Sequence, residues 1–288
     1  MTDLAAIGSM LAESLPYIQR HAGSTVVVKY GGNAIDGVGG ADGVSGFAAD
    51  VALLSAVGLR PVVVHGGGPQ ISAWMERAGI EPTFSDGLRV TDPATMEIVQ
   101  MVLLGIVNPM LVTAINSYGV RAVGVSGLDG TALRTVARAP SLGRVGEIVG
   151  VDGAVIEALM TAGAVPVVAT VGVGGDGTIY NVNADEAAAA VAVALGASRL
   201  LYLTNVAGVR SDRGDASSII TRATRDEAAA LLSNGQVDGG MIPKLRGCIA
   251  AVDGGVGAAH VLDGTAPHAL LIELFTDGGI GTMITATR

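Results

Sequence analysis

The sequence predicts an α/β protein in which a mainly parallel sheet is covered by helices on both faces. Short runs of β-branched residues alternate with stretches of helical spacing along the chain. The runs are almost continuously apolar, which indicates strands buried on both faces, as in a parallel sheet. Glycine clusters follow several of these runs, and sheets of this kind bind ligands at the carboxyl ends of their strands.

Composition narrows the class of protein further. Half of the 288 residues are hydrophobic but only 3% are aromatic, so Ala, Val, Ile and Leu must form the core. The net charge of −9 supplies no overall field that would attract nucleic acid or an anionic membrane. The single cysteine, Cys248, excludes an intramolecular disulfide and a Cys-rich zinc site. Residues 1–23 lack the pattern of a signal peptide, so we expect a cytoplasmic protein.

The first predicted element is an amphipathic helix over residues 4–18. Its apolar residues recur at helical spacing, and Pro16 inside it is expected to kink the helix or to split it in two. The sequence leaves open whether this helix packs on the core of its own chain or serves as an interaction arm.

The strands and helices that follow are predicted from apolar runs and from helical periodicity. Strands are expected at 25–29, 61–65, 120–125, 165–171 and 200–204, and helices at 46–57, 69–78, 94–118, 154–162 and 184–195. Residues 172–177 are expected to turn a hairpin into a strand that starts at Thr178. Residues 36–46 carry almost no side-chain bulk and are predicted to form a loop, either a mobile lid or a tolerated surface loop.

The strongest local signal is the strand–glycine–helix unit at 62–71, which contains Gly66, Gly67 and Gly68. Glycines without Cβ allow backbone N–H groups to approach a ligand, and the helix that follows adds its positive dipole end. Such a nest can hold phosphoryl oxygens, although a plain tight turn has the same pattern. The unit is neither a Walker loop nor a dinucleotide fingerprint, because both spacings are absent.

Lysine is rare in this chain, with Lys29 and Lys244 as its only two copies. Lys29 ends the first predicted strand directly before Tyr30-Gly31-Gly32, and Lys244 ends the segment Gly239-Gly-Met-Ile-Pro-Lys244. Lysine carries a compact charge on a long stem, so two lysines on opposite sides of a transferring phosphoryl group would neutralise its charge. The alternative is that both are ordinary surface residues.

Three polar residues complete the set of candidates. Asp185 begins an Ala-rich helix, where it either caps the helix or orients the two lysines. Asn181, just before it, is expected to bind the acceptor. Arg89 is suited to a bidentate pair with a substrate carboxylate, and its alternative role is a structural ion pair.

Seven segments in order resemble the acetylglutamate kinases of the amino-acid-kinase family, and the match runs almost end to end. The segments are 26–34, 62–71, 87–92, 181–185, 239–245, 259–264 and 273–284. The resemblance implies an open three-layer αβα sandwich with a mainly parallel sheet of about eight strands. It also implies an N-terminal interaction helix at 1–23, an acceptor-binding and dimerisation lobe at 24–180, and an ATP-binding lobe at 181–288.

The resemblance assigns roles to the candidate residues. It implies that the enzyme moves the γ-phosphoryl group of ATP to the side-chain carboxylate of N-acetyl-L-glutamate, with Mg²⁺ held mainly by the phosphates. Lys29, Lys244 and Asp185 would be catalytic. The remaining assignments are Gly67, Gly68, Arg89 and Asn181 for the acceptor, Gly31, Gly32 and Gly66 for phosphate, and Thr204, Asn205, Gly208 and Met241 for the nucleotide.

The resemblance also implies regulation, because arginine-sensitive members carry an extra N-terminal helix that joins dimers into a hexamer. Residues 1–23 are similar to that helix, and the arginine pocket would include Tyr17, His268, Glu273 and Gly281. Three features depart from the family pattern. The 36–46 loop is rich in glycine, Leu128 replaces a common charged residue, and Arg199 replaces a common lysine.

Two other functions remain open at this point. One is a kinase of the same family that acts on a carrier-linked α-aminoadipate in lysine synthesis, for which a basic surface around the pocket would be expected. The other is a catalytically silent, ligand-sensing protein on the same fold. The two lysines and the complete glycine nest favour an active kinase over the silent protein.

Overall fold

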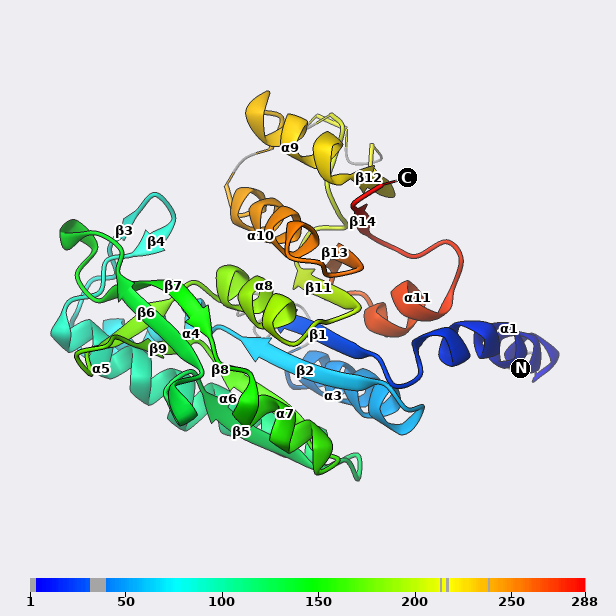
Figure 1. Cartoon of the computed structure of the whole chain (residues 1–288), viewed down its shortest axis with the longest axis horizontal. Helices are drawn as coiled ribbons and strands as arrows, with labels where there is room; N and C mark the ends of the chain where they lie inside the picture. Colours follow the sequence, from blue (N-terminus) through cyan, green and yellow to red (C-terminus); the bar gives the residue numbers. More distant parts are fainter. Residues whose placement is uncertain (1–3, 32–39, 213, 216–217, 238, 288) are drawn as a thin grey trace.

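The computed structural model describes residues 4–31, 40–212, 214–215, 218–237 and 239–287, and its centre is one eight-stranded sheet (Figure 1). The strand order is β12-β14-β13-β11-β1-β2-β8-β5, and β14 is antiparallel to β13 while the other neighbours are parallel. The strands are β1 (Thr25–Tyr30), β2 (Arg60–His65), β5 (Ala122–Ser126), β8 (Val165–Ala169), β11 (Arg199–Thr204), β12 (Arg222–Thr224), β13 (Ala258–Asp263) and β14 (Thr282–Thr285).

Helices cover both faces of this sheet and create two hydrophobic cores, which confirms the predicted three-layer α/β class. The first core includes residues of α3 (Gly40–Ala56), α4 (Gly68–Arg77), α5 (Pro93–Val102), α6 (Asn108–Asn116) and α11 (Ala269–Phe275). The second includes residues of α7 (Ala154–Thr161), α8 (Ala184–Ala194), α9 (Arg225–Ser233) and α10 (Met241–Asp253).

Strand β1 shows how the two cores divide the side chains. Successive residues of a strand point to opposite faces. Val26, Val28 and Tyr30 belong to the first core, and Val27 belongs to the second. Lys29 therefore lies on the same face as Val27, beneath α8 and α10. The alternation of the strand alone directs this lysine toward the helices that carry Asp185 and Lys244.

Two smaller sheets lie at one end of the molecule, opposite α1 (Leu4–His21), which lies beside α11 (Figure 1). One is a closed barrel of β6 (Leu133–Ala137), β7 (Val145–Val151), β9 (Val171–Val173) and β10 (Ile179–Val182). The other is the β3–β4 hairpin (Phe84–Ser85 and Leu88–Arg89). The turn between β9 and β10 confirms the hairpin predicted at 172–177.

Several sequence-based boundaries were wrong. The predicted 36–46 loop is helical from Gly40 onward, where α3 begins, and residues 36–39 lie outside the described part of the chain. The predicted strand 165–171 is two strands, because the chain leaves the large sheet after Ala169 and enters the barrel at Val171. Pro16 neither ends nor splits α1, which is assigned as one helix of 18 residues.

The predicted helix 94–118 is confirmed as one helical stretch with a widened π-helical turn at Leu103–Val107 between α5 and α6. The stretch Pro93–Asn116 is long and apolar enough to cross a membrane by length and composition alone. In this fold Val99, Leu103 and Leu111 of that stretch lie in the first core. A core helix passes the same test, so the stretch is weak support for a membrane span.

Candidate active site

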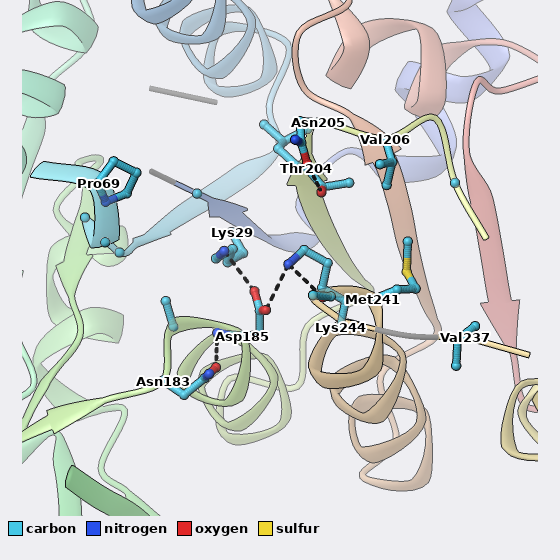
Figure 2. A pocket seen from close by; sticks show the side chains of 18 of the residues that line it. Lys29, Pro69, Asn183, Asp185, Thr204, Asn205, Val206, Val237, Met241 and Lys244 are labelled. Carbon is cyan, nitrogen blue, oxygen red and sulfur yellow. Dashed lines mark hydrogen bonds and ion pairs between the residues drawn. The ribbon is translucent and has the colours of Figure 1, made fainter. Parts of the chain in front are cut away.

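A cavity of about 560 Å³ opens where β1, β2 and β11 end, at the carboxyl edge of the sheet. It brings together eleven of the residues predicted from sequence, and Figure 2 shows several of them around one space. The eleven are Lys29, Gly31, Gly66, Gly67, Gly68, Asp185, Thr204, Asn205, Gly208, Met241 and Lys244.

Asp185 is held between the two lysines of the chain. Lys29 Nζ lies 2.8 Å from Asp185 Oδ1, and Lys244 Nζ lies 3.1 Å from Asp185 Oδ2 (Figure 2). The contact between Lys244 and Oδ2 has the geometry of a hydrogen bond, whereas the contact between Lys29 and Oδ1 is an ion pair without that geometry. Lys244 also donates to the Gly240 carbonyl at 3.2 Å. One carboxylate thus holds two ammonium groups at the wall of one cavity.

Burial and charge act against each other in this cluster. Burial lowers the pKa of Lys29, the charge of Lys244 acts in the same direction, and Asp185 opposes both. Burial by itself would raise the pKa of Asp185, but the charges of Lys29 and Lys244 outweigh it and hold that pKa below its ordinary value. Asp185 is therefore an anion at neutral pH, and its charge favours the protonated form of Lys29.

The start of α8 places the Asp185 carboxylate. Asn183 caps this helix, because its Oδ1 accepts hydrogen bonds from the N–H groups of Asp185 at 2.9 Å and Glu186 at 3.2 Å. The buried Tyr202 hydroxyl donates to the Asp185 carbonyl at 2.8 Å. A carboxylate in the first turn of a helix is also favoured by the helix dipole. Of the two roles predicted for Asp185, the cap is supplied by Asn183 instead, which leaves the Asp185 side chain free to hold the lysines.

The glycine nest forms the opposite wall of the cavity. Gly67 precedes α4 and Gly68 begins it, and neither N–H donates a hydrogen bond to another described residue. Free N–H groups at a helix start are donors for an anion. A Cβ at Gly67 would come within 2.8 Å of Leu103 Cδ2, and one at Gly66 within 3.2 Å of Ala184 Cβ. A side chain at Gly67 would therefore require Leu103 to shift.

The predicted phosphate site includes two further glycines, Gly31 and Gly32. A Cβ at Gly31 would lie 3.0 Å from Lys29 Nζ, so the absence of a side chain there leaves room for the ammonium group. Gly32 lies outside the described residues.

Arg89 and Asn181 do not line the cavity, and of the two Arg89 contacts the nest, through the Gly68 carbonyl. Arg89 is 7% exposed and donates through Nη2 to the Gly68 carbonyl at 2.9 Å and to Ser72 Oγ at 2.8 Å. Among the described residues no carboxylate pairs with it. Burial lowers the pKa of Arg89. Asn181 Nδ2 donates to Thr91 Oγ1 at 3.2 Å.

The predicted arginine ligands lie away from the cavity, around α1 and α11. Tyr17 donates to Asp277, and His268 Nδ1 lies 2.6 Å from Asp50 Oδ1. Glu273 is buried, with His260 Nδ1 at 2.7 Å from Oε1 and the N–H groups of Ile280 and Gly281 on Oε2 at 2.8 and 3.1 Å. Both Glu273 oxygens are thus occupied within the protein.

The cavity also contains residues that sequence reasoning missed. Val206 and Arg210 follow β11, and Gln236 and Val237 precede α10. Arg210 is the first charged residue after the fifth predicted strand, and that position could have marked it as a candidate. Gln70 was quoted only as part of a motif, yet both polar atoms of its amide are buried without a partner, beside Gly67. No local pattern signals such an orphaned amide.

The hydrogen-bond donors and positive charges that line the cavity suit a nucleoside triphosphate better than a metal ion held by the protein. Lys29, Lys244 and the free N–H groups of Gly67 and Gly68 all attract anions. Asp185 is the one acidic residue among the described residues that line the cavity, and it already binds both lysines. Among the described residues there is no group of three or more His, Cys, Asp or Glu side chains that would hold a metal ion.

This fold and this site define a class of protein. Residues 24–263 match the model of the amino acid kinase family, and the chain belongs to that family. It is thus a kinase, as the two lysines and the glycine nest predicted.

Individual relatives narrow the class. The chain is 48% identical over 98% of its length to an acetylglutamate kinase of Symbiobacterium thermophilum, and covers 97% of it. It is 50% identical over 97% of its length to that of Thermosynechococcus vestitus, and covers 94% of it.

The N-acetylglutamate synthase of Neisseria gonorrhoeae, solved with coenzyme A and N-acetyl-glutamate, superposes with a TM-score of 0.85 at 29% identity. That match covers 97% of this chain but 63% of the synthase. The same synthase with coenzyme A and L-arginine gives 0.81 at 27% identity, covering 97% of this chain and 65% of the synthase.

Proposed function

We propose that this protein transfers the γ-phosphoryl group of ATP to the side-chain carboxylate of N-acetyl-L-glutamate, a step of arginine synthesis. The observation that carries the proposal is the cavity in which Lys29 and Lys244 share Asp185 opposite the free N–H groups of Gly67 and Gly68. The choice of acceptor is supported by relatives of about 50% identity that are named acetylglutamate kinase.

The residues around the cavity would stabilise the charge of the moving phosphoryl group. A carboxylate is a sufficient nucleophile, so no residue of the chain need form a covalent intermediate. Lys29 and Lys244 would neutralise charge on the acceptor and donor sides, with Asp185 holding both. The N–H groups of Gly67 and Gly68 would bind the equatorial oxygens, together with Gly31, Gly32 and Gly66. One such donor is worth about 10²–10³ in kcat in other enzymes.

Arg89 and Asn181 would hold the α-carboxylate end of the acceptor. The buried Arg89 guanidinium has no carboxylate partner among the described residues. A buried cation without an opposite charge nearby is costly even when it is hydrogen-bonded, and an acceptor carboxylate would supply that charge. The unpaired amide of Gln70 offers further hydrogen-bonding capacity beside Gly67.

The nucleotide would lie on the side of the cavity formed by Thr204, Asn205, Gly208 and Met241. Thr204 ends β11, Asn205 and Gly208 follow it, and Met241 begins α10, in the part of the chain that we assign to the ATP-binding lobe (181–288). Mg²⁺ would accompany ATP, bound mainly by phosphate oxygens and water, because Asp185 is already bound to lysine. Its contribution would be to neutralise phosphate charge.

The remaining parts of the proposal concern assembly and control. Residues 24–180 would bind the acceptor and form a homodimer, α1 would join dimers into a hexamer, and the enzyme would act in the cytoplasm. Arginine would inhibit the enzyme through Tyr17, His268, Glu273 and Gly281. The support is that Tyr17 of α1 reaches Asp277, close in sequence to Glu273, and that a synthase of similar fold was solved with L-arginine. Glu273 would have to exchange a protein partner for the ligand.

The decisive experiment is steady-state ADP release with acetylglutamate, free glutamate and α-aminoadipate compared side by side. Rapid release with acetylglutamate alone is expected. The proposal fails if α-aminoadipate is a better acceptor than acetylglutamate, or if wild type and Lys29→Met release ADP equally slowly with every acceptor. A titration with arginine at millimolar concentration tests regulation separately, and an unchanged rate would remove the inhibitory site.

A further inference from the structure

His65 ends β2 directly before the glycine nest, and its ring is entirely buried. Ring atom Nδ1 lies 3.0 Å from the Gly66 carbonyl oxygen, and Nε2 lies 3.0 Å from Asn108 Nδ2. Asn108 begins α6, directly after the π-helical turn. The ring does not line the cavity. It lies between the helix behind the nest and the first peptide of the nest.

The hydrogen-bond partners of Asn108 determine where the ring carries its proton. Asn108 Nδ2 also contacts the Val167 carbonyl oxygen at 2.8 Å. A carbonyl can only accept, so the atom beside it must be the amide nitrogen, which then donates its second hydrogen to His65 Nε2. That nitrogen must be an acceptor, so the proton of the ring is on Nδ1 and is donated to Gly66. Burial lowers the pKa of His65 to about 4, so the ring is neutral.

This hydrogen bond fixes the orientation of one peptide group. In a trans peptide the carbonyl and the following N–H point in opposite directions. A Gly66 carbonyl held by His65 therefore turns the Gly67 N–H away from the ring, and Gly67 lines the cavity. Glycine has little intrinsic preference for one backbone orientation, so an external constraint is needed here.

The geometry assigns His65 and Asn108 as a pair of positioning residues, in which Asn108 selects the ring tautomer and the ring aims the Gly67 N–H at the transferred phosphoryl group. The inference rests on the proposed phosphoryl transfer. The π-helical turn contributes to the same constraint, since its Leu103 and Val107 pack where a Gly67 side chain would lie. Neither His65 nor Asn108 touches the reacting atoms.

The tautomer is tested first, on the unliganded protein. Two-bond ¹H–¹⁵N correlation spectra at neutral pH should show the His65 ring protonated on Nδ1 and unprotonated on Nε2. A proton on Nε2, or on both nitrogens, overturns the inference. Because this measurement needs no substrate, it stands even where the choice of acceptor proves wrong.

The kinetic test compares His65→Asn with His65→Gln. The asparagine amide lies near the place of Nδ1 and can donate to Gly66, whereas the glutamine amide lies near Nε2 and cannot. We expect His65→Asn to keep kcat within about 5-fold of wild type and His65→Gln to lose about 10- to 100-fold, the scale of one misdirected oxyanion donor. KM for ATP should change little in both. Equal kcat values for the two variants overturn the inference.

Asn108→Ala is the companion variant, and Asn116→Ala is its matched control. Asn116 lies on the same helix, and its Oδ1 accepts from the Ala122 N–H at 2.7 Å, far along α6 from the nest. Both variants should lower the melting temperature, but only Asn108→Ala should lower kcat and mix the His65 tautomers. An Asn108→Ala kcat within 2-fold of the control overturns the inference. Should Asn108→Ala not fold, the tautomer spectrum of the wild type and the kinetics of the two His65 variants still test the inference.

Discussion

Replacing Asp185 with asparagine would leave two lysine ammonium groups without the carboxylate that they share. Both contacts are short, 2.8 Å to Lys29 and 3.1 Å to Lys244, and the side chains are 7%, 9% and 14% exposed for Asp185, Lys29 and Lys244. At an effective dielectric constant of about 20, the two attractions amount to roughly 6 and 5 kcal/mol. Desolvation offsets much of this, and removing one partner of a buried pair costs about 3–5 kcal/mol.

We therefore expect Asp185→Asn to lower the free energy of unfolding by about 3–5 kcal/mol, which corresponds to a fall of roughly 6–20 °C in melting temperature for a domain of this size. Turnover should fall by about 10²–10³, because the lysines lose their fixed positions around the phosphoryl group. Thermal unfolding followed by circular dichroism and a coupled ADP assay measure the two effects on the same sample.

The pH dependence of the variant's stability should be steeper above neutrality than that of the wild type, which a simple packing defect would not reproduce. Asp185 raises the pKa of Lys29 in the wild type, so its loss lowers that pKa further. The unfolded chain then binds more protons at Lys29 than the folded one, and stability must rise with pH above neutrality. In the wild type the Asp185 carboxylate has a lowered pKa, so its contribution is present above its unfolded pKa and is lost as the pH falls.

The double variant Asp185→Asn/Lys29→Met provides the control. It removes one of the stranded charges and should regain part of the lost stability, so the two substitutions should not be additive. A melting temperature within about 2 °C of wild type for Asp185→Asn, or a kcat within about 3-fold, would refute the shared-carboxylate reasoning.

Three further changes test other parts of the structure. Gly67→Ala places a Cβ 2.8 Å from Leu103 Cδ2, so it should cost about 1–3 kcal/mol of stability. Its effect on kcat should be larger than its effect on KM, and unchanged kinetics would contradict the role of the nest. Arg89→Met should raise KM for the acceptor about 10- to 100-fold without changing KM for ATP; equal shifts in both would contradict an acceptor contact. Thr224→Ala breaks the capping box with Glu227 at the start of α9 and should cost about 1 kcal/mol in denaturant unfolding while activity persists.

The parts of the fold that were predictable are those governed by local pattern. The apolar runs that became β1, β2, β8 and β11 are buried on both faces, so burial left a clear signal in the sequence. The barrel was not foreseen apart from its β9–β10 turn. In β6, buried Leu133 and Thr135 alternate with exposed residues, and such short strands lack the continuous apolar character of the central sheet.

At the site, the rarity of lysine and the spacing of the motifs identified candidate residues but not the contacts that these residues make. Lysine scarcity singled out Lys29 and Lys244, and the structure shows both on one carboxylate. Arg89 shows the opposite case, since its contacts with Gly68 and Ser72 depend on the β3–β4 hairpin packing against the start of α4. Glu273 is a third case, because this predicted arginine ligand has both carboxylate oxygens hydrogen-bonded within the protein.

The sequence by itself determined the α/β class, the strand ends that carry glycine, and the face of β1 on which Lys29 lies, because period-2 alternation and backbone freedom are properties of a few neighbouring residues. Only the tertiary structure decided that β11 lies beside β1, so that Asp185 and Lys244 come within reach of Lys29. It also decided which nitrogen of His65 bears the proton, because that depends on the Val167 carbonyl of the neighbouring strand β8. Contacts between distant segments follow from the packing of whole layers, which no local window of residues encodes.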